Sequence, residues 1–133
     1  MIVVDSSVWI DYFNGNKTVE ADYLDQILGY EPILVGDLIL LEVLQGFRSE
    51  ADFRAAKSLM EDLPTRQLLN PTRAIVAANN FRSLKKRGAT VRKAADVIIG
   101  SYCIAEGLPL LFSDRDFAPM VKHLGLQSAM NDA

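Results

Sequence analysis

The sequence Ile2-Val3-Val4-Asp5 begins the chain with a short apolar run that ends at a carboxylate. A run of this length favours a buried strand, and Ser6 or Ser7 is placed to cap a helix after it. Two further apolar runs, Pro32–Gly36 and Leu110–Phe112, are also followed by helical patterns. Short strands that alternate with helices predict a central, mostly parallel sheet covered on both faces, which is a three-layer α/β/α sandwich.

Most of the remaining chain has apolar residues at every third or fourth position, as amphipathic helices do. No repeat or linker divides these patterns, so the 133 residues are expected to form one domain spanning 1–133. Short strand patterns occur at Gln67–Leu69 and Leu126–Ser128. The predicted helices run through Phe13 and over Thr18–Leu28, Leu38–Phe47, Ala51–Leu63, Pro71 or Thr72 to near Gly88, Lys93–Glu106 and Phe117–Leu124.

Composition narrows the classes of protein to which the chain can belong. Half of the residues are apolar, as in globular domains. No apolar run is close to the length of a membrane span, which is about 18 residues. The N-terminus lacks the basic segment of a secretory signal, so we expect a cytoplasmic protein with no membrane association. The single Cys103 permits no internal disulfide, which agrees with a reducing compartment.

The same composition excludes several kinds of catalytic site. One cysteine and one histidine, His123, cannot build the usual zinc sites of thiolates and imidazoles. A Ser-His-Asp triad would need His123, and no glycine-rich turn surrounds any serine. The net charge of −3 gives no overall attraction for nucleic acid, so local patches must supply any such attraction.

Four carboxylates end or interrupt apolar segments, where an unpaired charge is costly to bury. Ligands of parallel sheets bind beyond the carboxyl ends of the strands, which would bring Asp5 and Asp114 to one edge. Glu42 lies in the helix after the second strand and Asp96 in the first turn of a later helix, so both can reach the same pocket. We therefore expect these four acids to converge on a cation, with Asp116 beside them.

Each acid also has a simpler interpretation. Asp5, which precedes two serines, and Asp114 both fit helix caps, and Asp116 is then an ordinary acid of a first helical turn. Asp96 gains from the helix dipole without any ligand. Glu42 is not explained by a cap, although it faces solvent if its helix has a narrow polar stripe.

Carboxylate oxygens without thiolate or imidazole ligands select hard cations, which here means Mg²⁺ or Mn²⁺. Such ions promote phosphoryl chemistry. The sequence has neither a Gly-Lys-Ser/Thr loop nor a Gly-x-Gly-x-x-Gly turn, which disfavours hydrolysis of nucleoside triphosphates. Metal-assisted hydrolysis of a phosphodiester remains.

A basic segment leads into the helix that carries Asp96. A charge run of this kind is often only a solvated face of the protein. Its position beside a predicted metal ligand also fits the guidance of phosphate groups, to which Arg115 would add. The cations of the segment are Arg82, Lys85, Lys86, Arg87, Arg92 and Lys93.

Four segments carry the acids in a specific order. Ile2–Ile10 joins a strand to Asp-Ser-Ser, and Leu41–Gly46 reads Leu-Glu-Val-Leu-Gln-Gly. Gly88–Gly100 contains Gly-Ala-Thr-Val-Arg and then Asp-Val-Ile-Ile-Gly, and Leu111–Phe117 reads Leu-Phe-Ser-Asp-Arg-Asp-Phe. In order and spacing these segments resemble the PIN-domain ribonucleases, and specifically the VapC-type toxins of bacterial toxin–antitoxin pairs. The likeness runs from residue 1 to about residue 128.

This resemblance implies an α/β/α sandwich with a Mg²⁺ or Mn²⁺ site, and hydrolysis of RNA that leaves a 5′-phosphate. Asp5 and Asp96 would be the principal metal ligands, with Glu42 and Asp114 completing the acidic quartet. Asp116 matches an acid that part of the family carries. Ser7 or Ser113 would hydrogen-bond the carboxylates. The residues expected to contact RNA are Arg87, Arg92, Lys93 and Arg115.

The resemblance also implies partners. The substrate would be structured RNA of the transfer or ribosomal class, the protein a homodimer, and its inhibitor a cognate VapB-type antitoxin. Ser113 stands where many members have threonine, which retains the hydroxyl group. Gly100 stands where alanine is common and should matter only for helix packing.

Three alternatives of other classes need comparison with this interpretation. A phosphoacceptor signalling domain has a similar length, but it needs an acidic pair at the first strand and a lysine after a late one, and neither is present. An aspartyl phosphatase would need an aspartate at the position of Ser7. A non-catalytic domain that binds RNA or a partner protein would leave RNA uncut with or without Mn²⁺.

Overall fold

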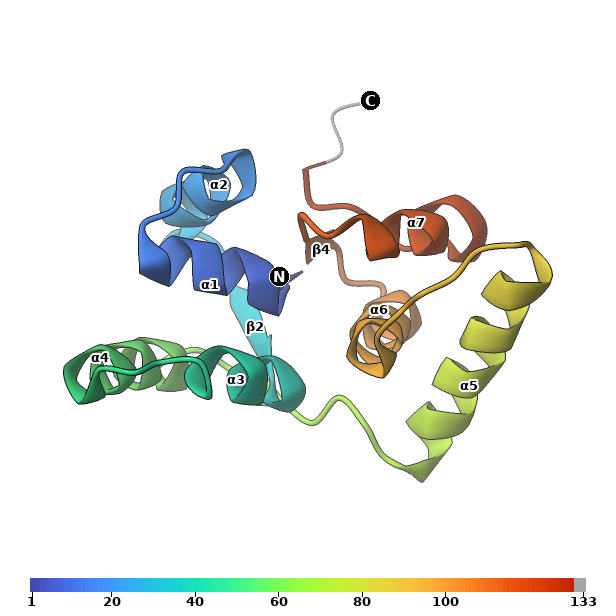
Figure 1. Ribbon diagram of the computed structural model, residues 1–133, viewed down its shortest axis with the longest axis horizontal. Helices are drawn as coiled ribbons and strands as arrows, with labels where there is room; N and C mark the ends of the chain where they lie inside the picture. The colour runs from blue at the N-terminus through green and yellow to red at the C-terminus, as the bar shows by residue number, and fades with distance from the viewer. Residues whose placement is uncertain (131–133) are drawn as a thin grey trace.

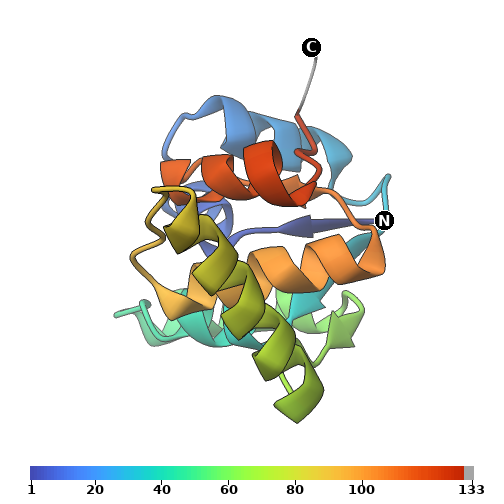
Figure 2. The ribbon, with the colours of Figure 1, turned by 90° about the vertical axis from the view of Figure 1, so that its right-hand side faces the viewer.

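A parallel sheet of four strands lies at the centre of the computed structural model, which describes residues 1–130. Helices cover both faces of the sheet, and β1 passes between α6 and α7 (Figure 2). The prediction of an α/β/α sandwich with a parallel sheet is therefore confirmed. The strands, in the order β3-β2-β1-β4, are β1 (Ile2–Val4), β2 (Ile33–Gly36), β3 (Thr65–Arg66) and β4 (Leu110–Leu111).

Four of the α-helices, α1, α2, α4 and α5, begin after a polar residue whose side chain accepts a hydrogen bond from the first turn. Thr18 accepts from Ala21 N–H, and Asn70 accepts from Arg73 N–H. Within residues 1–130, no helix is both long and apolar enough to cross a membrane. The helices, shown in Figure 1, are α1 (Ser6–Asn14), α2 (Val19–Ile27), α3 (Asp37–Leu44), α4 (Glu50–Glu61), α5 (Pro71–Lys86), α6 (Ala94–Glu106), the short 3₁₀ helix η1 (Arg115–Phe117) and α7 (Ala118–Leu124).

The three predicted apolar strands form the buried part of the sheet. All residues of β1, β2 and β4 are buried, as expected for strands covered on both faces. Trp9 of α1 is fully buried and stacks on Phe13, with 5.7 Å between the ring centroids. The aromatic residues of α1 therefore belong to the core, which anchors the helix that follows Asp5.

Two local predictions are wrong at the boundaries of the sheet. The third strand is Thr65–Arg66 rather than Gln67–Leu69, because Leu68 N–H donates to the Asp37 carboxylate instead of to β2. Residues Leu126–Ser128 do not form a strand, since only Ser128 makes a single bridge to β4.

Two predictions about helix ends are also wrong. The cap of α1 is Asp5 rather than Ser6 or Ser7, because Asp5 keeps an extended backbone and its carboxylate accepts from the N–H of Ser7. Helix α3 ends at Leu44, before the predicted Phe47.

Gly36, the last residue of β2, lies where a side chain would not fit. A Cβ atom there would overlap the side chain of Leu68, which is buried in the core. We expect Gly36→Ala to lower the free energy of unfolding by about 1–3 kcal/mol through overpacking. Gly46→Ala is the matched control, because its Cβ would lie 3.7 Å from the nearest atom, an ordinary contact. Urea unfolding measures both, and equal stabilities would contradict the expectation.

Candidate active site

The carboxyl ends of β1 and β4 lie side by side because Val4 pairs with Leu111. Asp5 follows β1 directly, and its N–H donates to the Leu111 carbonyl at 2.9 Å. Asp114 comes shortly after β4 and caps the short helix η1. The sheet thus places both acids at the edge at which parallel sheets bind ligands.

Five acids gather at this edge in two overlapping groups. Asp5, Glu42 and Asp96 line one cavity of about 180 Å³. Carboxylate oxygens of Asp96, Asp114 and Asp116 lie within 4.8 Å of one another. Because Asp96 belongs to both groups, β1, α3, α6 and the turn after β4 contribute to a single acid cluster, which we define as these five residues.

Asp96 is the most constrained member of the acid cluster. Its side chain is buried, and its Oδ2 atom has no hydrogen-bond partner among residues 1–130. Burial, together with the negative charges of Asp5, Asp114 and Glu42 and against the charge of Lys93, raises the pKa of Asp96 to about 6. An unpartnered buried oxygen among other acids is a position that favours a cation.

Asp5 is held in place by Ser7, the residue two positions along the chain. The Ser7 hydroxyl donates to Asp5 Oδ2 at 2.6 Å, and the Ser7 N–H donates to the same oxygen at 3.3 Å. Burial raises the pKa of Asp5, and these hydrogen bonds act in the opposite direction. Asp5 therefore caps α1 and faces the cavity at the same time, so the two interpretations of this residue are compatible.

Glu42 is positioned by a residue that sequence reasoning missed. The Ser6 hydroxyl donates to Glu42 Oε1 at 2.6 Å, which ties α1 to α3 across the cavity. Ser113, expected to contact a carboxylate, instead lies 3.4 Å from the Ser7 hydroxyl. The only signal for Ser6 in the sequence was its position beside Asp5.

Asp114 and Asp116 form the more exposed side of the acid cluster. The Asp116 N–H donates to Asp114 Oδ1 at 2.9 Å, so both acids also have the local role of a capped turn. Arg92 donates to Asp116 Oδ2 from its backbone N–H at 3.4 Å and from Nε at 3.3 Å. Lys93 Nζ lies 3.9 Å from Asp114 Oδ2.

The four cations predicted to contact RNA differ in how close they lie to the acid cluster. Arg92 and Lys93 lie beside the acids, as their ion pairs show. Arg115 is exposed in η1, next to both Asp114 and Asp116 in the chain, and Arg87 is exposed at the end of α5.

Charge is unbalanced inside the cavity. Within residues 1–130, Asp5, Glu42 and Asp96 form no ion pair, whereas the two outer acids each have a cation within 4 Å. Carboxylates without counter-ions repel one another at close range. Oxygen ligands of this kind fit a hard divalent cation such as Mg²⁺ or Mn²⁺.

Comparison with known proteins identifies the family of this chain. The family model for the PIN domain matches residues 2–122. The chain belongs to the PIN-domain family. A similar PIN-domain relative is ribonuclease VapC11 of Mycobacterium tuberculosis, which is 27% identical over 131 residues, 97% of this chain and 98% of the relative.

Solved structures share the PIN fold at lower identity. VapBC2 from Rickettsia felis, bound to a DNA fragment from its promoter, superposes with a TM-score of 0.75 at 15% identity and covers 96% of this chain and 97% of its own. A toxin–antitoxin complex from Klebsiella pneumoniae gives a TM-score of 0.69 at 18% identity, with coverages of 89% and 91%. Membership of the PIN family does not favour the phosphoacceptor alternative.

Proposed function

We propose that this PIN domain is the ribonuclease toxin of a toxin–antitoxin pair, and that it hydrolyses RNA at the acid cluster with a divalent metal ion. The observation that carries the proposal is the buried Asp96 carboxylate, whose Oδ2 lacks a partner in a cavity shared with Asp5 and Glu42. Relatives named VapC ribonucleases support the same chemistry.

Asp5 and Asp96 are the proposed principal metal ligands. Both are buried, and burial is the main cause of the raised pKa of each, so a bound cation would offset the cost of burying two ionised carboxylates. Glu42 and Asp114 would complete the ligand set or hold water, and Asp116 lies close enough to Asp96 to take part. Mg²⁺ and Mn²⁺ both suit a set of carboxylate oxygens.

The ion, when bound, would polarise the scissile phosphate and favour deprotonation of the attacking water. The residues of this chain keep the ligands in position. Ser7 fixes the orientation of Asp5, and Ser6 fixes that of Glu42. Attack by water on phosphorus forms one P–O bond and breaks the bond to the 3′ oxygen, which leaves a 5′-phosphate and a 3′-hydroxyl.

The cationic rim is the proposed contact for the RNA backbone. Arg92 and Lys93 are more than half exposed although they touch the outer acids, so they can turn to a phosphate. Arg87 and Arg115 would extend this contact on either side. The substrate class that we propose is structured RNA, of the transfer or ribosomal kind.

The proposed function includes partners. A toxin of this kind is held inactive by a cognate VapB-type antitoxin, and the toxin–antitoxin complex from K. pneumoniae shares its fold with this chain. We further propose that the chain acts as a homodimer. An enzyme that cuts transfer or ribosomal RNA works in the cytoplasm, which is where we place it.

Incubation of the purified chain with total RNA and Mn²⁺ or Mg²⁺ tests the function. We expect specific fragments that carry 5′-phosphates, no cleavage in EDTA, and arrest of growth when the protein is induced in bacteria. Sequencing of the 5′ ends after brief induction identifies the RNA. Intact RNA under all metal conditions, together with normal growth, would favour the non-catalytic alternative and contradict the proposal.

A further inference from the structure

The C-terminal half of α5 carries a hollow lined by cations, apart from the acid cluster. Arg82, Lys85 and Lys86 line this hollow together with Phe81, and its volume is about 430 Å³. All of these side chains are exposed. The three cations are spaced three and four residues apart, so they lie on one face of the helix. We call these four residues the α5 basic face.

The cations of the α5 basic face are not neutralised within the protein. Among residues 1–130, Arg82, Lys85 and Lys86 form no ion pair. Like charges at this spacing destabilise a helix slightly. The negative end of the helix dipole favours Lys85 and Lys86 in the last turn, but Arg82 lies before that turn. The dipole therefore does not account for the whole face, and a bound anion would relieve the repulsion between its cations.

Charge is distributed unevenly along the whole chain. The segment 71–93 holds seven of the 14 lysines and arginines and none of the 17 acids, so its net charge is +7. The other 110 residues carry the remaining seven cations and all 17 acids, which gives them a net charge of −10. A polyanion is therefore attracted to this segment and repelled by the net charge of the rest of the chain.

The segment after α5 connects the α5 basic face to the acid cluster. Arg87 follows the last residue of α5, and the chain then runs from α5, at one end of the molecule, back to the start of α6 (Figure 1). Arg92 and Lys93, at the end of this segment, form ion pairs with two acids of the cluster. Cations thus follow one another from the acid cluster to α5.

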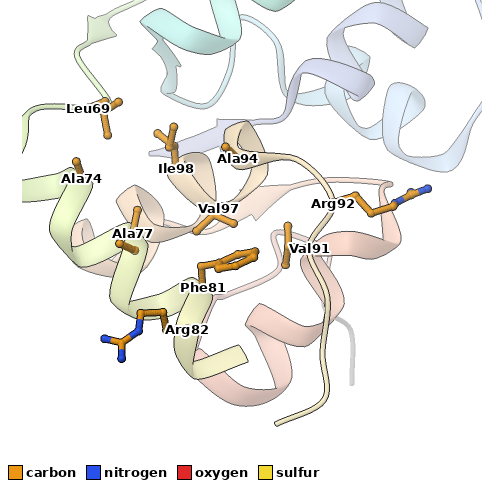
Figure 3. A pocket seen from close by; sticks show the side chains of 11 residues that line it. Leu69, Ala74, Ala77, Phe81, Arg82, Val91, Arg92, Ala94, Val97 and Ile98 are labelled. Atoms are coloured by element: carbon orange, nitrogen blue, oxygen red, sulfur yellow. The ribbon is translucent and has the colours of Figure 1, made fainter. Parts of the chain in front are cut away.

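These properties favour RNA as the occupant of the α5 basic face. Phe81 is 38% exposed, and in Figure 3 it projects from α5 beside Arg82, whose guanidinium group points away from the apolar side chains. RNA supplies both the phosphates and the planar bases that bind to cations beside an aromatic ring. A second copy of the chain, packed by a two-fold axis through α5, would instead bring the same cations against themselves.

We propose that the α5 basic face binds an unpaired segment of the RNA substrate beyond the scissile bond, an inference that rests on the proposed function. Arg82, Lys85 and Lys86 contact phosphates, and Phe81 stacks on a base. The RNA runs from the acid cluster along residues 87–93 to α5. The substrate is therefore an RNA whose single-stranded loop or end continues past the cleavage site.

Neutralising two cations tests the electrostatic contact. The double variant Arg82→Gln/Lys85→Gln removes two charges from the face, and Lys17→Gln/Arg54→Gln removes two from exposed positions outside it. Glutamine has a helix propensity similar to those of arginine and lysine, so α5 should stay folded. The substrates are RNAs of about 16 and about 4 nucleotides that carry the cleavage site mapped by 5′-end sequencing. For the long RNA, the face variant should raise KM roughly tenfold and keep kcat. The short RNA and the control variant should show no change.

Direct binding in EDTA separates this contact from cleavage. Fluorescence anisotropy with the labelled long RNA measures affinity at several salt concentrations, and the slope of log Kd against log salt should fall by about 1–2 in the face variant. A 4-thiouridine placed away from the scissile bond should crosslink to the tryptic peptide 74–82, which contains Phe81. Phe81→Leu keeps an apolar side chain but removes the ring, so it should weaken binding of the long RNA about fivefold or more.

Other results would overturn the inference. Equal losses on the long and the short RNA would place the cations at the cleavage site itself, and an unchanged KM and salt slope would show that they do not contact RNA. A smaller mass of the face variant in light scattering would assign the face to a second copy of the chain. Loss of antitoxin binding with unchanged RNA binding would assign it to that partner. A wild type that crosslinks through peptide 74–82 but cuts no RNA would contradict the proposed function and leave this contact in place.

Discussion

Asp96→Asn is expected to abolish RNA cleavage while making the metal-free protein more stable. The substitution keeps the shape of the side chain and removes the charge that would bind the metal ion. Loss of about 3–4 kcal/mol of transition-state stabilisation corresponds to a decrease in rate of two to three orders of magnitude. Growth arrest on induction should disappear with the cleavage.

The gain in stability follows from the raised pKa of Asp96. Because the pKa is about 6 in the folded protein against 3.8 without burial, ionisation at pH 7 opposes folding by about 3 kcal/mol at most. Asparagine removes this penalty, so the melting temperature in EDTA should rise by several degrees. Asp25→Asn, at an exposed position of α2, is the control and should change neither property. Full cleavage by Asp96→Asn would contradict the proposed role of this residue.

The second large effect is a change in the sign of the pH dependence of stability when a metal ion is added. In EDTA, the folded protein retains a proton on Asp96 that the unfolded chain releases as the pH rises from about 4 to about 6. The wild type therefore loses stability over this range relative to Asp96→Asn. The raised pKa of Asp5 also lowers the stability as the pH rises, and it does so equally in the wild type and in Asp96→Asn.

Excess Mn²⁺ should reverse this trend, because ionised carboxylates bind the metal and only the folded state holds them together. The melting temperature of the wild type relative to Asp96→Asn should then rise with pH over the same range. Thermal melts at several pH values between 4 and 7.5, in EDTA and in Mn²⁺, measure both curves. Parallel curves in the two conditions would show that the acids do not bind the ion together.

The order of strands and helices was predictable because each element carries its own signal. Apolar runs such as Ile2–Val4 are shorter than a typical helix, which favours a buried strand, and the long helices show clear periodicity. The failures occurred where a partner distant in the chain decides the local structure. Leu68 is not part of the sheet because its N–H donates to the Asp37 carboxylate. No pattern within residues 67–69 predicts this hydrogen bond.

The acids of the cluster could be named from the sequence because each stands out against apolar neighbours. The hydrogen-bond partners of these acids could not be predicted from the sequence. Ser6 contacts Glu42 and Ser7 contacts Asp5, yet the two serines are adjacent and equivalent in the sequence. Only the direction in which α1 leaves β1 decides which hydroxyl group faces which carboxylate.

The groove between α5 and α6, which Ala74 and Phe81 line (Figure 3), could not be predicted from the sequence for a related reason. Ala74, Ala78 and Phe81 follow the spacing of an ordinary core face. Whether such a face is covered depends on how many neighbours reach it, and α5 packs against α6 and α7 alone among its major contacts. The face that looks like core in the sequence therefore borders an open groove in the structure.

By itself the sequence determined the alternation of strands and helices, the parallel sheet and the identity of the acids, since these depend on local polarity and on the edge at which parallel strands end. The tertiary structure decided which oxygens share a cavity, which of them lacks a partner and which apolar face lacks a neighbour. Those properties depend on distances between segments far apart in the chain, and such distances are fixed only when the helices pack on the sheet.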